Sequence, residues 1–390
     1  MLSRPLLCLL VLGGLLLTAR VPDCHGRFTA TPAVSFREEY NDNIFMDSTN
    51  LQDDVIITLS PGLTLVEQTE RLEATLAGRL DLVDYAALDR LDAVDHDYSA
   101  RTSYEVTPRC LVRAEAAYRE DSRPDRDLET TGLILGTTSR ERQTYTLGID
   151  LAATELGTGS LTYTHNTVNF RETAASDYTS NSLMPAASIR LDKYLPRTTG
   201  ETALAATFYD YPGIEIRNLS WTVGFSHELS ERRRLAAAIG PRITETRIEN
   251  IRLTEDNSGW VGRLIYSQWS EYAEVNLSLS QDITSGSDVI AGATEQTALS
   301  ADGRYHFGED LWAGLTAAFH RNQSSANALS TGDIDRYTYR LRPRVSWDLS
   351  DTLSMDLSYV WVLHDNRDAG QESHRNQVLL RLHWQKSLDD

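Results

Sequence analysis

Apolar and polar residues alternate along most of this chain, from about residue 29 to the end. A period of two is that of a β-strand, because successive side chains of a strand point to opposite faces. A helical period is hard to find anywhere in the sequence. The alternation therefore predicts an all-β chain. Clear examples are Val55, Ile57, Leu59, Pro61, Leu63 and Leu65; Leu72, Ala74, Leu76, Leu80 and Leu82; and Leu353, Met355, Leu357, Tyr359, Trp361 and Leu363.

The connections between these segments alternate in length. Short ones lie at 67–69, 107–109, 308–310 and 349–351. Membrane barrels have tight turns at the periplasmic rim and longer loops outside, so the rhythm predicts a transmembrane antiparallel up-and-down β-barrel of about 18 strands, with 16 as the alternative. An even number places both termini on the periplasmic side. The long polar connections are 41–54, 84–95, 120–141, 171–179, 248–258, 282–293, 322–335 and 364–375.

The start of the chain predicts export. The longest apolar run, residues 6–17, follows the basic Arg4. It is shorter than the ~20 apolar residues of a membrane helix, and its flanks are those of a signal peptide. We predict a cleaved signal peptide over residues 1–26, with Ala19 as the alternative last residue removed. The barrel then covers 27–384, a short polar tail covers 385–390, and the predicted location is the bacterial outer membrane.

Charge and cysteine content exclude several classes of protein. The formal net charge is -19, which argues against nucleic acid as a partner because phosphate binding needs a basic face. Only Cys110 remains beyond the predicted leader, which excludes a disulfide framework. Catalytic, phosphate-binding and metal-binding motifs are not evident. We therefore expect no enzyme activity, no cofactor and no metal site.

The last predicted strand carries an assembly signal. Its apolar face is formed by Val378, Leu380, Leu382 and Trp384. This face resembles the C-terminal strand by which outer-membrane proteins are recognised for assembly. The predicted partners are accordingly the barrel assembly machinery, outer-membrane lipid and lipopolysaccharide.

Residues 32–45 hold a distinctive turn, in which Tyr40 is followed by Asn41, Asp42, Asn43 and Ile44. The segment resembles the opening of the porin 2 family of outer-membrane barrels, which includes members associated with exopolysaccharide or PEP-CTERM (exosortase) systems. The resemblance implies an outer-membrane barrel that serves surface polysaccharide, with polysaccharide export components as partners and no catalytic residues. From the residues themselves, Asn and Asp favour a plain turn, and calcium binding by Asp42 is the alternative.

An arginine ladder is the clearest candidate for a binding site. Arg336, Arg340, Arg342 and Arg344 share one face of a predicted strand, opposite a face of aromatic and aliphatic residues. The expected inward neighbours are small: Gly314, Thr316, Ala318, Ser354 and Ser358. We hypothesise that the ladder faces the lumen and attracts anionic solutes or acidic sugar polymers. The alternative is structural pairing with Asp356 and other luminal acids.

Strand number leads to two functional hypotheses. A barrel of about 18 strands is too wide for side chains to fill, so an aqueous channel normally remains. The first hypothesis is a porin-like channel for small solutes, linked to exopolysaccharide export. The alternative is a structural or assembly barrel of a surface-polysaccharide or exosortase system, with a plugged lumen and no general pore activity.

Overall fold

The computed structural model describes residues 26–124, 126–128, 132, 139–171, 176–249, 252–284, 294–324 and 334–389. The predicted signal peptide lies outside these residues, apart from Gly26. In the described part of the chain, no helix is both long enough and apolar enough to cross a membrane. The one short helical element there is a 3-10 turn, η1 (Asp89–Leu91).

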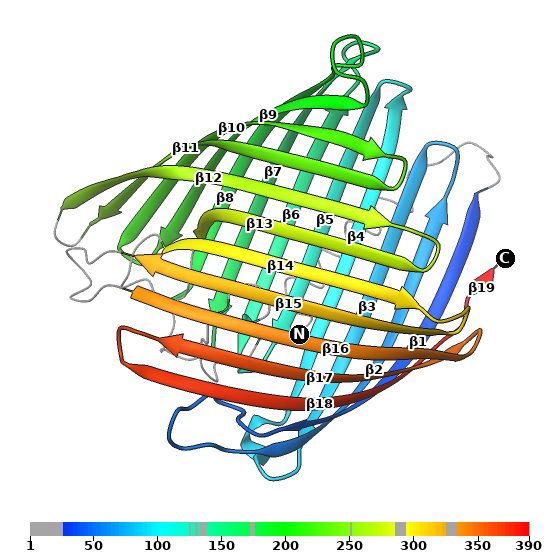
Figure 1. Ribbon diagram of the computed structural model, residues 1–390, viewed down its shortest axis with the longest axis vertical. Coiled ribbons are helices and arrows are strands. Elements are labelled where there is room, and N and C mark those ends of the chain that lie inside the picture. The colour runs from blue at the N-terminus through cyan, green and yellow to red at the C-terminus, as the bar shows by residue number, and fades with distance from the viewer. Residues whose placement is uncertain are drawn as a thin grey trace, which may run out of the picture.

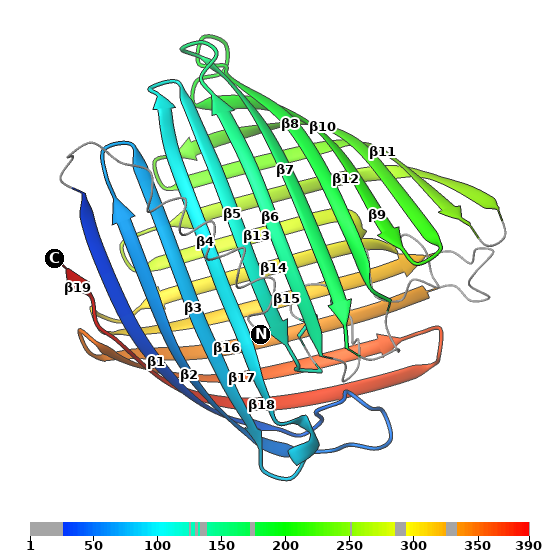
Figure 2. The same cartoon turned by 180° about the vertical axis from the view of Figure 1, so that it is seen from behind.

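Eighteen long strands follow one another around a closed antiparallel barrel, in which each strand pairs with its neighbours in sequence. The barrel closes between the first and the last, with Ala33 opposite Gln385 and Asn41 opposite Gln377. Figures 1 and 2 show the tilted strands of the near and far walls crossing each other in projection. The predicted fold is confirmed. The strands are β1 (Arg27–Asn41), β2 (Asp54–Gln68), β3 (Leu72–Tyr85), β4 (Ala93–Thr107), β5 (Cys110–Asp121), β6 (Arg140–Leu151), β7 (Gly157–Phe170), β8 (Tyr178–Arg190), β9 (Thr198–Tyr211), β10 (Ile214–Ser230), β11 (Arg233–Ile248), β12 (Leu253–Trp269), β13 (Ala273–Thr284), β14 (Thr294–His306), β15 (Leu311–Ser324), β16 (Ile334–Ser350), β17 (Leu353–Asn366) and β18 (Gln371–Gln385).

The faces of the barrel are inverted relative to a soluble protein. On β2, Ile57, Leu59 and Leu63 are exposed on the outside, whereas Thr58 is buried on the inside. The same parity holds around the wall, so the apolar surface faces hydrocarbon and the polar residues face the lumen. Closure leaves no free sheet edge between β1 and β18, which matters because an unpaired backbone amide in hydrocarbon costs several kcal/mol.

The last long strand, β18, ends at the rim where β1 begins, and a two-residue strand, β19 (Leu388–Asp389), pairs there with Thr29 and Ala30 of β1. The predicted alternation of long and short connections holds only in part. Residues 191–197 form a seven-residue connection at this rim, whereas only 212–213 join β9 to β10 at the opposite rim.

The predicted loops 248–258 and 364–375 are much shorter in the structure. Each of these segments is mostly strand, because β12 begins at Leu253 and β17 continues to Asn366. On β12 the outward positions near the strand's start are polar, namely Thr254, Asp256 and Ser258. Because these residues lie beyond the apolar band, their polar sequence resembles that of a loop. Their backbone is nevertheless fully paired with β11.

Candidate functional site

A segment after β5 folds into the barrel and crosses the lumen. Its described residues, 122–128 without Asp125 and then 132, are called the crossing segment below. Arg123 donates two hydrogen bonds of 2.9 Å to the Glu39 carboxylate of β1. The carbonyl of Gly132 accepts a hydrogen bond of 2.7 Å from the Thr338 hydroxyl of β16. The segment therefore reaches from the end of β5 to the wall formed by β15–β17.

An apolar contact holds the middle of the crossing segment. Leu128 is 1% exposed and packs with Val360 and Val362, two inward residues of β17. Met46 joins this cluster from the connection between β1 and β2, and Leu379 of β18 packs against it. Inward apolar residues are unusual in a water-filled barrel, and here they are covered by the crossing segment.

Buried ion pairs fix the base of the crossing segment. Arg140 of β6 contacts Asp127 at 2.8 Å and Asp121 at 3.1 Å, and Arg126 contacts Asp121 at 3.1 Å. Burial lowers the pKa of the Arg126 guanidinium, and the Asp121 carboxylate opposes this effect. Because these side chains are almost fully buried, removing one partner would leave an uncompensated charge at a cost of about 3–5 kcal/mol.

The turn predicted at Tyr40–Ile44 forms, and it bends into the lumen. Tyr40 points outward, and the Asp42 carboxylate accepts hydrogen bonds from the Asn376 backbone (2.7 Å) and side-chain amide (2.6 Å) of β18. Asn43 is fully buried and donates to the carbonyls of Asp47 and His374. Ile44 packs against Ile56, Val83 and Tyr85. Across the described residues, no group of three or more His, Cys, Asp or Glu side chains is placed to hold a metal ion.

The arginine ladder lies on the luminal face of β16, as its parity predicted. Arg340, Arg342 and Arg344 stand opposite Ala318, Thr316 and Gly314 of β15. Arg344 forms an ion pair with Asp356 at 2.5 Å, which is the pairing that the structural alternative expected. Arg336, nearer the outer end, lies opposite Asn322. Binding of anionic solutes by the ladder stays a prediction.

Arg342 also belongs to a charged cavity of about 240 Å³ beside the crossing segment. It donates a long hydrogen bond of 3.4 Å to the Ser358 hydroxyl. The cavity mixes both signs of charge, and Arg342 is the ladder residue that lines it. This charged region is called the ionic constriction below. The charged residues that line it are Arg37, Glu39, Arg79, Asp81, Asp95, Asp97, Arg119, Glu120, Asp121, Arg123, Arg126, Arg342 and Arg381.

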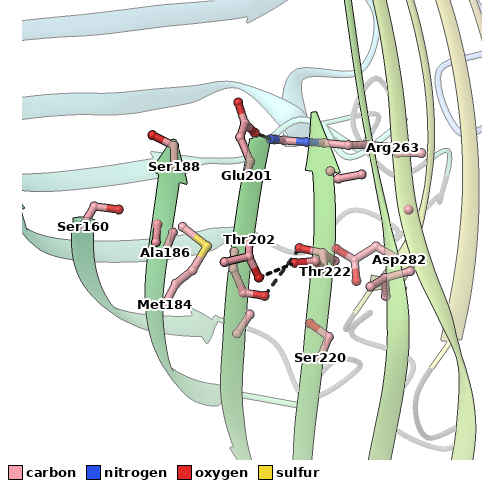
Figure 3. Close-up of a pocket in the computed structure, with 18 of the residues that line it drawn as sticks. Ser160, Met184, Ala186, Ser188, Glu201, Thr202, Ser220, Thr222, Arg263 and Asp282 are labelled. Carbon is pink, nitrogen blue, oxygen red and sulfur yellow. Dashed lines mark hydrogen bonds and ion pairs between the residues drawn. The ribbon is translucent and has the colours of Figure 1, made fainter. Parts of the chain in front are cut away.

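The wall from β7 to β13 is different, because small side chains line it. They surround a cavity of about 430 Å³, shown in Figure 3. Arg263 of β12 reaches Glu201 of β9 at 3.6 Å. The residues between them in register are Ala238 and Gly224, whose small size lets the long side chains meet across two strands. Labelled small residues of this wall are Ser160, Ala186, Ser188, Ser220 and Thr222.

The crossing segment was missed from sequence, where 120–141 was treated as one long polar loop. Two signals were available in retrospect: the dense alternating charge over 119–127 and the isolated Leu128 behind it. A loop exposed to water has no need of either. Val378 and Trp384 of the predicted assembly face are exposed on the outside of β18; the role of this face in assembly stays a prediction.

Comparison with known proteins agrees with this architecture. Residues 22–184 match the family described as "Putative beta-barrel porin 2". The family resemblance predicted from Tyr40–Ile44 is confirmed over that segment. The chain is an integral, porin-like outer-membrane β-barrel. Among curated proteins, no significant sequence match is found.

Solved structures with this fold are distant in sequence. The siderophore receptor PirA from Pseudomonas aeruginosa is 13% identical, with a TM-score of 0.50 over 94% of this chain and 81% of its own. The outer membrane protein opdK from Pseudomonas aeruginosa is 10% identical, with a TM-score of 0.50 over 92% and 99%. OccAB4 from Acinetobacter baumannii is 7% identical, with a TM-score of 0.50 over 93% and 98%. At these identities the likeness concerns the fold alone.

Proposed function

We propose that this outer-membrane barrel is a passive channel for small polar solutes, and that solutes pass along the wall formed by β7–β13 without any chemical step. The observation that carries the proposal is the position of the crossing segment. It is held by β1 and β15–β17 through Arg123, Leu128 and Gly132. The cavity of about 430 Å³ lies against the other wall.

The composition of that wall suits hydrated solutes. Serine and threonine hydroxyls offer hydrogen bonds in both directions, and small side chains leave room for water. Arg263 and Glu201 are partly exposed and pair with each other, and Asp282 is the third charged residue among the described residues that line the cavity. We therefore expect weak solute discrimination on this side, while the ionic constriction near Arg342 biases ion flow.

The test is the conductance of the purified protein in planar lipid bilayers. The proposal predicts discrete single-channel steps whose size grows with salt concentration. Reversal potentials under a salt gradient then give the ion selectivity. If folded and inserted protein gives no conductance steps, the channel proposal is contradicted and the plugged structural barrel is favoured.

The second candidate, a plugged structural barrel, is favoured by one observation. The crossing segment and the Asn43 turn both fold inward and are tied down by buried ion pairs and hydrogen bonds. Under this candidate the space along β7–β13 does not continue to both rims, and the folded protein is silent in bilayers. The proposed link to exopolysaccharide export is tested separately, by comparing surface polysaccharide in a strain with and without this protein.

A further inference from the structure

The barrel wall has a split between β12 and β13 at its outer end. Pairing of these strands stops at Gly262 and Gln281. Beyond that point β12 continues to Leu253 paired only with β11, and β13 continues to Thr284 paired only with β14. Residues 253–261 of β12 therefore have no strand partner on the β13 side. Among the described strands, this is the longest stretch that is paired on one side only.

Hollows lie on both faces of the wall where the split begins. The first is the luminal cavity of about 430 Å³ along β7–β13. The second hollow, of about 550 Å³, lies on the lipid-facing side. Six residues line both: Gly224, Ala238, Gly262, Arg263, Ser280 and Gln281. Since the same residues bound the two spaces, only a thin wall separates the lumen from the lipid there.

The outer hollow has the chemistry of a hydrocarbon site. The large apolar side chains that line it point outward: Val223, Phe225, Ile239, Trp260, Leu264 and Leu279. On β12 the outward residues change from polar Ser258 to Trp260 at this level. Trp is enriched at membrane–water interfaces, so the split begins at the outer edge of the apolar band, beside the headgroups of the outer leaflet.

An ion pair bridges the split from the luminal side. Arg242 of β11 is fully buried and contacts Glu295 of β14 at 2.5 Å, which spans the two strands that have separated. Its guanidinium also donates to Thr244 (2.9 Å) and Asn257 (3.3 Å). Gly259 lies directly opposite Arg242 on β12, and a side chain there would collide with the guanidinium.

We propose that the β12–β13 seam is a lateral passage between the lumen and the outer leaflet for an amphipathic solute with one hydrocarbon chain. The chain occupies the apolar hollow, and the polar head lies in the luminal cavity near Arg263 and Ser280. The Arg242–Glu295 pair restricts the width of the passage. The passage goes beyond the proposed channel, because it does not need flow along the barrel axis.

The experiment uses a long-chain fatty acid with a photoreactive diazirine beside its carboxylate, added to membranes that hold the full chain. Labelled residues are mapped by mass spectrometry. The proposal predicts labelling of luminal Thr222 and Ser280 in addition to lipid-facing Leu264 and Leu279. Labelling confined to lipid-facing residues would overturn it.

A disulfide staple supplies the decisive comparison. Continuing the register past Gly262 and Gln281 places Val261 opposite Asp282, so Val261→Cys with Asp282→Cys is expected to close the seam. Oxidation should abolish luminal labelling, and reduction should restore it. The matched control is Thr207→Cys with Asn218→Cys, a directly opposed pair in the continuous β9–β10 seam. Luminal labelling that persists in the stapled protein would refute the passage.

Two further variants test the proposal without relying on formation of the disulfide. Gln281→Trp adds bulk to the outer hollow and should reduce luminal labelling, whereas Glu295→Gln removes the bridging charge and should increase it. An unchanged pattern in both would contradict the proposal. Single-channel conductance is recorded for each protein, so loss of axial current and loss of lateral labelling are separate results.

Discussion

Leu128 offers a direct test of the crossing segment. Replacing a fully buried leucine with alanine costs about 2–5 kcal/mol, the lost transfer energy plus a cavity term. The site has little freedom to collapse, because Val360 and Val362 belong to a strand paired on both sides. Taking about 3 kcal/mol for Leu128→Ala, the population of barrels with this contact broken rises roughly 100-fold, since each 1.4 kcal/mol is a factor of ten.

Planar-bilayer recordings measure the consequence. Leu128→Ala should show more frequent transitions to larger conductance levels than the unaltered protein, and Leu128→Asp should show more still, because it buries a carboxylate among apolar side chains. The control is Leu147→Ala, a lipid-facing leucine of β6 that is 57% exposed. Equal recordings for all four proteins would refute the role of the crossing segment as a constriction.

Other residues give independent predictions. Gly132→Ala should resemble Leu128→Ala in recordings, because Gly132 has φ +70 and an added Cβ would lie 2.7 Å from the His320 Cβ; unchanged recordings would contradict this docking. Arg342→Ala with Arg344→Ala should shift selectivity towards cations, as two positive charges leave the luminal face of β16 and Asp356 loses its ion pair; unchanged reversal potentials would remove the ladder hypothesis. Asn43→Ala should destabilise the barrel by about 1–3 kcal/mol through a buried carbonyl left without its donor, read from the urea midpoint of unfolding against Asn50→Ala, an exposed residue of the same turn. Trp384→Ala should slow assembly, seen as less of the heat-modifiable folded form on gels, and normal assembly would dismiss the C-terminal signal.

The wall of the barrel was predictable from sequence because lipid imposes a strict rule on it. Outward positions within the band are mostly apolar, so strands such as β2 and β17 alternate cleanly and the strand count follows. The luminal face of β16 was predictable for the same reason, since parity alone assigns Arg340, Arg342 and Arg344 to the inside.

The contents of the lumen were not predictable, because they depend on contacts between residues far apart in the chain. Leu128 and Val362 are separated by more than two hundred residues, and nothing local to either indicates the other. The split between β12 and β13 was equally hidden: 248–258 was predicted to be a loop, whereas β12 begins at Leu253 and pairs with β13 only from Gly262 onward. Arg344 is an intermediate case. Its sequence position predicted that it faces the lumen and named Asp356 as a candidate partner, but could not decide between binding of anionic solutes and an ion pair with Asp356.

The most direct test of the central claim, that solutes pass along β7–β13 and not beside β17, is current block by a charged methanethiosulfonate reagent. Single cysteines are placed in a Cys110→Ser background at Thr222 on the open wall and at Val360, which is 2% exposed beneath the crossing segment. If solutes follow the β7–β13 wall, the reagent reduces the current through Thr222→Cys and leaves the current through Val360→Cys unchanged. Block at Val360→Cys with none at Thr222→Cys would contradict it.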